Sequence, residues 1–183
     1  MVTQITMLPE LNLGIIVLTN QQEGGAFRSI TNQILDGYLN KPGRDWVATL
    51  SASRKKSLAA AKAVMDKVAA EVAKAKAAGG TTLAPAAVAG TYSDAWFGAV
   101  TLTAKDGKLR FDSKRSPNLT GEVFPYKANS FIVRWDDRSM DADAFINFRL
   151  DVEGRPSGFT MEPISPLTDF SYDFQDLDFR RVN

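Results

Sequence analysis

The sequence predicts a mainly β protein: an antiparallel barrel of about eight strands, preceded by an N-terminal strand, a helix and a long alanine-rich connector helix. Between residues 90 and 182, apolar and polar side chains alternate in short runs separated by turn residues, as in Val100–Thr103 and Phe131–Trp135. Asp106-Gly107 separates two such runs, and this pair is typical of a two-residue hairpin turn. Strands with one apolar and one polar face suit a sheet that closes on itself.

The opening segment, residues 1–42, predicts one strand and one helix. Leu13–Thr19 is a continuous apolar run with β-branched residues, which is typical of a strand buried on both faces. A helix is expected over residues 25–40, ended by Lys41-Pro42-Gly43, because its apolar residues recur at steps of three and four. One strand and one helix cannot cover each other's apolar faces, so we expect this segment to be the remnant of a larger domain.

Residues 43–85 predict a helical connector. A long alanine-rich helix is expected from Ser53 to Ala78, ended by Gly79–Thr82, with Asp45 as a candidate cap for the segment before it. Its apolar seam fits either a solvated connector docked along a narrow stripe or a coiled-coil contact between two copies. The seam consists of Leu58, Ala61, Met65, Val68, Val72 and Ala75.

Residues 86–183 predict the barrel. Alternating runs follow at Ile146–Val152 and Phe159–Met161, and a last run places Phe170, Tyr172 and Phe174 on one face. A barrel of eight strands is either filled by its own side chains or holds one small ligand. The aromatic residues favour a filled interior; they are Phe111, Phe124, Phe131, Trp135, Phe145, Phe148 and Phe159.

Composition excludes several classes of function. The 183 residues include no cysteine and no histidine, which excludes disulfides, Cys nucleophiles, His-based triads and most zinc sites, and we expect no metal and no cofactor. The net charge of +1 gives no reason to expect nucleic acid as a partner. No segment has the length of a membrane span or the pattern of a signal peptide, so the chain as given is expected to stay in the cytoplasm.

Five aromatic residues are the candidate contact residues for a partner or ligand: Tyr92, Trp96, Phe97, Trp135 and Tyr172. The first three cluster near the start of the barrel. They fit either a buried plug at one barrel end or a surface patch that contacts another domain or a peptide-like ligand, since Trp and Tyr anchor interfaces well.

Several motifs resemble serine hydrolases of the β-lactamase and penicillin-binding-protein family. The stretch from Pro9 through Leu18-Thr19-Asn20 to Asp36 resembles the end of their catalytic domain. The second half is similar to the C-terminal accessory domain, of undescribed function, that many of these bacterial enzymes carry. The motifs are Gly90-Thr91-Tyr92-Ser93, Trp96-Phe97-Gly98, Ser116–Gly121, Phe131–Asp137 and Ser165–Phe170. The resemblance implies a lipocalin-like barrel, and full-length relatives that are often exported or periplasmic.

The catalytic residues of that family are not expected here. The family needs a Ser-x-x-Lys nucleophile, a Tyr-x-Asn or equivalent, and a Lys/His-x-Gly strand that converge on one carbonyl carbon. Short matches exist at Ser53–Lys56, Tyr38–Asn40 and Lys41–Gly43, but their order is reversed and two of them are contiguous. We therefore expect no enzyme activity of the chain itself.

Together these observations predict a non-catalytic accessory domain, as a separate chain or a fragment. We expect it to pack on a β-lactamase-like catalytic domain and to shape access to that domain's site, or to self-associate through its N-terminal strand and helices. The alternative is a lipocalin-like binder of a small apolar ligand or peptide.

Overall fold

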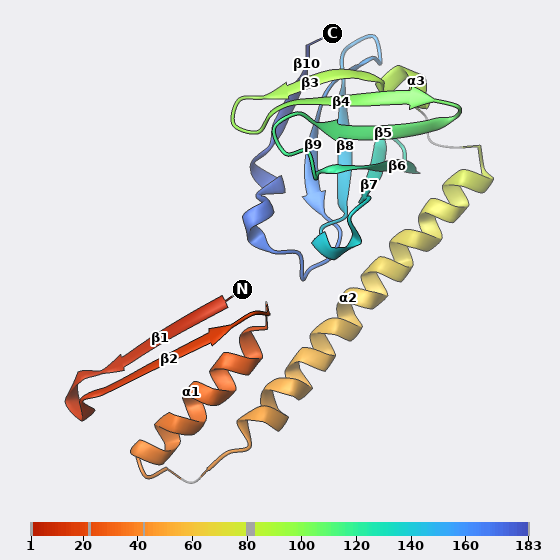
Figure 1. The fold of residues 1–183 in the computed structure, drawn as a ribbon. Coiled ribbons are helices and arrows are strands. Elements are labelled where there is room, and N and C mark those ends of the chain that lie inside the picture. The colour runs from red at the N-terminus through yellow and green to blue at the C-terminus, as the bar shows by residue number, and fades with distance from the viewer. Residues whose placement is uncertain (1, 22, 42, 80–82, 183) are drawn as a thin grey trace. The chain divides into compact units, whose positions relative to one another are not determined.

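The computed structural model describes residues 2–21, 23–41, 43–79 and 83–182, and the chain divides into two compact units (Figure 1). The first unit is Met1–Ala60 and the second is Ala61–Asn183. Pro42 and residues 80–82, where the sequence predicted helix ends, lie outside the described residues.

The first unit opens with a β-hairpin where the sequence analysis predicted one strand. β1 (Val2–Leu8) pairs antiparallel with β2 (Leu13–Thr19), and a single 3₁₀ turn, η1 (Pro9–Leu11), connects them. Helix α1 (Gly24–Tyr38) contacts both strands, and Thr31 Oγ1 donates a 2.8 Å hydrogen bond to Gln4 Oε1. β1 was missed because no turn signal of the Asn-Gly type separates it from β2.

β2 is not buried on both faces, so that prediction is wrong. Ile15 and Val17 are buried, whereas Ile16 and Leu18 are 66% and 74% exposed. Burial alternates along β2 because α1 covers only one face of the two-stranded sheet. The unbroken apolar run therefore has an exposed side.

Helix α2 (Trp46–Ala77) begins earlier than the predicted Ser53, because the carboxylate of Asp45 caps it. The backbone N–H of Ala48 donates a 2.7 Å hydrogen bond to Asp45 Oδ1. In the second unit the predicted seam is buried against the outside of the barrel, where Val68 and Val72 pack with Ile132 and Ile164. Among the described residues, no helix combines the length and hydropathy needed to cross a membrane.

The outer contact with α2 corrects the predicted interior. Phe124 and Phe145 were expected to fill the barrel, but both pack on the outside with Met65 of α2. Lys127 and Glu71 form an ion pair of 3.2 Å beside them. Ile132 is buried for the same reason, although it alternates with the inward-facing Phe131 and Val133. The long helix thus gives three strands a second apolar face.

The second unit is a closed eight-stranded antiparallel barrel, which confirms the predicted fold class. Its strand order is β10-β3-β4-β5-β6-β7-β8-β9, and the short helix α3 (Pro85–Val88) precedes it. The predicted hairpin turn is confirmed, since Asp106 and Gly107 both have positive φ, at 51° and 75°. The strands are β3 (Gly90–Asp94), β4 (Gly98–Lys105), β5 (Lys108–Ser113), β6 (Thr120–Lys127), β7 (Ser130–Trp135), β8 (Ala144–Leu150), β9 (Pro156–Pro163) and β10 (Asp178–Arg181).

Aromatic rings occupy the barrel interior. Phe159 lies at the centre of the group and contacts the rings of Tyr92, Phe148 and Phe179 at centroid distances between 4.5 and 5.5 Å. Most of these pairs meet edge to face, the arrangement that ring quadrupoles favour. The inward rings are at most 2% exposed; they are Tyr92, Phe111, Phe131, Trp135, Phe148, Phe159 and Phe179.

The predicted strand over Phe170–Phe174 is wrong. This segment forms two 3₁₀ turns, η3 (Phe170–Tyr172) and η4 (Phe174–Asp176), before the short β10 begins. The carboxylate of Asp169 accepts a hydrogen bond from Ser171 N at 2.9 Å, and Asp173 adopts the left-handed conformation with φ of 49°. Asp side chains that accept hydrogen bonds from the nearby backbone compete with strand pairing. In this segment those local hydrogen bonds outweigh the period-two pattern.

Candidate functional site

The two ends of the barrel differ in the segments that join the strands. At one end the connections are short, at residues 106–107, 128–129 and 151–155. At the other end they are residues 95–97, 114–119, 136–143 and 164–177, and the last two contain the turns η2 (Arg138–Met140), η3 and η4. Binding residues concentrate on loops that a rigid scaffold holds. The candidate site lies at this loop-rich end.

The structure separates the five predicted contact residues into two groups. Tyr92 and Trp135 belong to the core: the Tyr92 hydroxyl donates to Val88 O at 2.9 Å, and Trp135 Nε1 donates to Ala142 O at 2.7 Å. Burial raises the pKa of Tyr92, and the nearby Arg181 cation opposes that rise. Trp96, Phe97 and Tyr172 instead line one surface groove of about 360 Å³.

We call this hollow the aromatic groove. Three separate loops contribute to it, so the groove exists only in the folded barrel. Phe97 and Tyr172 are half-buried against the core, whereas Trp96 is 61% exposed. The lining residues are Trp96, Phe97, Arg115, Ser116, Leu119, Ser171 and Tyr172. The volume falls within the range of small-ligand sites.

Asp94 holds the Trp96 loop. Its buried carboxylate accepts hydrogen bonds from Trp96 N at 2.8 Å and from Phe97 N at 2.7 Å through Oδ1. Its second oxygen accepts from Asp178 N at 2.9 Å, at the start of β10. Burial alone would raise the pKa of Asp94, but the three N–H donors outweigh it and the pKa lies below its usual value. An ionised Asp94 thus fixes the backbone of the loop that presents the indole.

Arg115 binds the same loop from the neighbouring loop between β5 and β6. Its Nη1 donates a 2.6 Å hydrogen bond to Trp96 O, and its side chain lies over Gly98. A Cβ at Gly98 would come within 3.3 Å of Arg115 Cδ, and φ at this residue is +88°. Glycine is therefore favoured at position 98 by the backbone conformation, whereas the contact with Arg115 is tight but with a flexible side chain.

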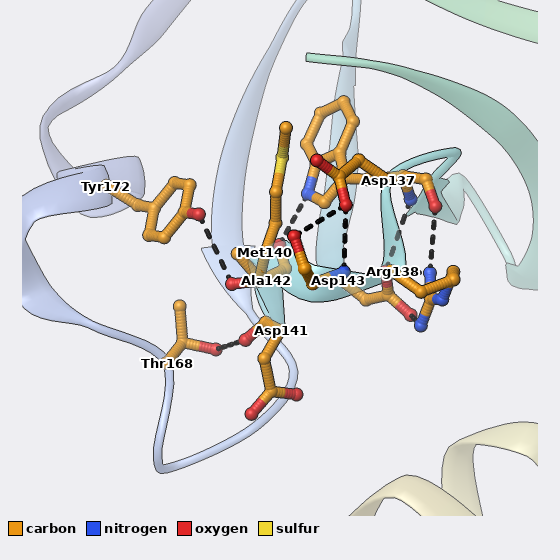
Figure 2. Close-up of polar contacts among 10 residues, drawn as sticks. Asp137, Arg138, Met140, Asp141, Ala142, Asp143, Thr168 and Tyr172 are labelled. Atoms are coloured by element: carbon orange, nitrogen blue, oxygen red, sulfur yellow. Dashed lines mark hydrogen bonds and ion pairs between the residues drawn. The ribbon is translucent and has the colours of Figure 1, made fainter. Parts of the chain in front are cut away.

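Tyr172 is positioned by the loop between β7 and β8 (Figure 2). Its hydroxyl donates to Met140 O at 3.2 Å, and its ring stacks on Phe174 at 5.5 Å. Thr168 Oγ1 donates to Asp141 O at 3.3 Å, which joins the same loop to the segment before η3. Burial raises the pKa of Tyr172, and nearby carboxylates raise it further, so the phenol stays neutral.

A buried carboxylate stiffens the β7–β8 loop. Asp143 binds the Arg138 guanidinium through both oxygens, at 2.7 and 2.8 Å, and Asp143 Oδ1 also accepts from Trp135 N (Figure 2). The hydrogen bonds to Asp143 raise the pKa of Arg138. This bidentate ion pair between Arg138 and Asp143 holds the loop that carries Met140.

The first unit carries a second candidate surface. We call it the hairpin face: the exposed side chains of Ile5, Met7, Ile16 and Leu18, between 60% and 74% exposed. Ile5 and Ile16 are direct cross-strand partners. Neither β1 nor β2 contains a charged residue. Exposed, charge-free apolar faces are common at sites of interaction, so the hairpin face is a candidate contact surface.

The aromatic groove presents aromatic rings, hydroxyl groups and one guanidinium, and this set of groups suits binding. Ser53, the first residue of the Ser-x-x-Lys match, is exposed within α2, and Tyr38 is the last residue of α1. Within the part of the chain that the structure describes, no three metal-ligating side chains come together.

Sequence reasoning missed Asp94 and Arg115, the two residues that position Trp96. Asp94 stands two residues before Trp96, which is the spacing of an Asx turn, so its role had a local signal. Arg115 had none, because the contact joins two loops that only the barrel brings together.

Comparison with known proteins gives one assignment for the chain. No curated protein matches it. Residues 74–181 match a family described as "Domain of unknown function (DUF3471)", a stretch that includes the end of α2 and nearly the whole barrel. The matched residues cover more than half of the chain, and the chain therefore belongs to the DUF3471 family.

Proposed function

We propose that this chain is a non-catalytic accessory module that packs on the catalytic domain of a β-lactamase-like serine hydrolase and shapes access to its site. The hairpin face is the observation that carries the proposal. The motif resemblance of residues 9–36 to the end of such a catalytic domain supplies the kind of partner. That domain lies either on the same polypeptide or on another.

The first unit buries few apolar side chains of its own. Its described buried residues up to Ala60 are Ile15, Val17, Ser29 and Thr31, so apolar burial rests on two side chains. Its exposed large apolar residues include the hairpin face, and also Ile30, Tyr38, Leu39, Val47 and Leu58. Burying the exposed part of the hairpin face would contribute on the order of 4 to 8 kcal/mol, before the losses of association.

The second candidate function, a carrier with a ligand inside the barrel, has less support. A lipocalin-like carrier needs interior space for its ligand. Here the inward rings are at most 2% exposed and contact one another, as Phe131 does with Phe148 and Phe111 with Phe159. A ligand would have to displace them.

The test combines binding and turnover. A Ser-x-x-Lys catalytic domain from the same genome is titrated with this chain by calorimetry, and its kcat/KM is measured with nitrocefin and with a D-alanyl peptide. The proposal expects saturable binding and a changed kcat/KM for the larger substrate. Ile16→Ser with Leu18→Ser should weaken binding at least about tenfold.

Val152→Ser is the matched control, because Val152 is fully exposed on the barrel and should leave binding unchanged. Hydrolysis of nitrocefin by this chain alone would contradict the proposal. So would a dimer in light scattering that Ile16→Ser with Leu18→Ser dissociates, together with no affinity of the chain for the catalytic domain.

A further inference from the structure

The aromatic groove has unused hydrogen-bond donors beside its exposed ring. Among the described residues, the indole N–H groups of Trp46 and Trp135 have acceptors, Asp36 Oδ2 and Ala142 O, at 2.7 Å each. Trp96 Nε1 has no such acceptor in the described part of the chain. The Ser116 and Ser171 hydroxyls, which line the same groove, also donate to no described residue.

Arg115 differs from the other barrel arginines. Every other arginine between residues 90 and 182 contacts a carboxylate or an aromatic ring; they are Arg110, Arg134, Arg138, Arg149, Arg155, Arg180 and Arg181. Arg115 contacts neither among the described residues, and its one hydrogen bond, to Trp96 O, uses Nη1 only. Nε and Nη2 remain, which is the pair of donors that can hold a carboxylate through both oxygens.

We propose that the aromatic groove binds the carboxyl terminus of a peptide whose last residue is apolar or aromatic. The carboxylate meets the Arg115 guanidinium, and the side chain lies against the ring of Trp96. Arg115 is bonded to the carbonyl of Trp96 itself, so the ligand's charge and its apolar group must be close together. They are close in a carboxyl-terminal residue, where both are attached to one Cα atom.

The groove is prepared for such a ligand. Asp94 fixes the Trp96 backbone with two hydrogen bonds, Arg115 fixes it with a third, and Tyr172 is held by Met140. A site that is ordered before binding loses less conformational entropy when the ligand arrives. The volume of about 360 Å³ suits one or two residues rather than a long segment. This inference does not depend on the hairpin face or on a hydrolase partner.

The test uses N-acetyl-L-phenylalanine and its neutral primary amide, which share the ring and differ in the charge. Each is titrated into the ¹⁵N-labelled full chain while the three indole N–H resonances are followed by NMR. We expect the acid to shift Trp96 and leave Trp46 and Trp135 in place, with a Kd on the order of 1 mM. The amide should bind about tenfold more weakly.

Arg115→Gln should reduce affinity for the acid to that of the amide, while Lys114→Gln, an equal change of charge on the adjacent exposed residue, should not. Arg115→Lys should recover part of the affinity. The acid–amide comparison on the unmodified chain needs no variant to fold. Equal affinity of acid and amide, shifts confined to residues outside the groove, or the same Trp96 shift with inorganic phosphate would each overturn the proposal.

Discussion

Replacement of Asp94 by alanine tests how the groove is held in place. The substitution removes the acceptor of three backbone N–H groups, on Trp96, Phe97 and Asp178. It therefore releases the Trp96 loop and the start of β10 together. Asp94→Asn is milder, because an amide oxygen can still accept from the loop, whereas the amide nitrogen would face the N–H of Asp178, donor against donor.

The size of the effect follows from these contacts. A hydrogen bond to a charged group contributes about 1.5 to 3 kcal/mol, but water can reach the two loop N–H groups after the change. We expect Asp94→Ala to lower the free energy of unfolding by about 3 kcal/mol and Asp94→Asn by about 1 to 2 kcal/mol. Asp66→Asn, an exposed residue of α2 in an i,i+4 pair, is the control and should change little.

The pH dependence of stability gives the sign of the Asp94 contribution. The folded pKa of Asp94 lies below its unfolded value, so the stabilisation is fully present above about pH 4. It is lost as the pH falls through the folded pKa. Asp94→Asn should therefore flatten the fall in stability below about pH 4 and leave the slope near neutral pH unchanged.

Urea unfolding followed by far-UV circular dichroism, at several pH values between about 2.5 and 7, measures both effects. The indole N–H resonance of Trp96 in the ¹⁵N-labelled folded variants reports on the loop. If Asp94→Ala were as stable as the unmodified chain, or if Asp94→Asn kept the full acid-dependent loss, the carboxylate would not hold the loop as described.

Three further substitutions test the barrel by the same urea assay. Gly121→Ala places a Cβ 2.2 Å from the Arg134 carbonyl oxygen, which is rigid backbone, and should lower the free energy of unfolding by about 3 kcal/mol. Gly14→Ala is its control, because a Cβ there meets nothing within 4 Å and should leave stability nearly unchanged. Val72→Ala empties part of the contact between α2 and the barrel and should lower stability by about 2 kcal/mol, against no change if α2 is a free connector. Trp135→Phe leaves a buried carbonyl without its donor and should lower stability by about 2 kcal/mol; an unchanged midpoint would contradict the role of that bond.

The barrel was predictable because its information is local. Alternation specifies which side chains share a face of a strand, and Asp106-Gly107 specifies a turn, since both residues need positive φ. Phe131, Val133 and Trp135 were expected on one face and are all buried together. The period-two pattern failed at Phe170–Phe174, where the carboxylate of Asp169 stabilises a turn that alternation cannot reveal.

The outer contact of the barrel was not predictable by pattern alone. A single period cannot say whether Phe124 and Phe145 face inward or outward when a helix covers the sheet from outside. Likewise, a continuous apolar run such as Ile15–Leu18 fits a strand buried on both faces or one with an exposed apolar side. Both errors have one cause: the sequence shows which residues are apolar but not what covers them.

The candidate site combines what the sequence could and could not show. Trp96 and Tyr172 were singled out by residue type, because Trp and Tyr anchor interfaces well. Their meeting in one groove depends on barrel closure, which brings the loops after β3, β5 and β9 to one end. Arg115 enters the site by the same closure. The sequence can therefore suggest which loop residues belong to a site of this kind. Their positions relative to one another have to come from the structure.

The two candidate surfaces have different structural support, and this bears on how they act. The aromatic groove is built on a barrel that closes all its edges and fills its interior with rings, so it is ordered without a partner. The hairpin face belongs to a unit whose apolar burial up to Ala60 rests on Ile15 and Val17. A two-stranded hairpin needs a packing partner to be stable in water, and among the described residues α1 covers only one of its two faces. The groove therefore suits reversible binding of a small ligand, whereas the hairpin face suits a lasting contact that completes the core of the first unit.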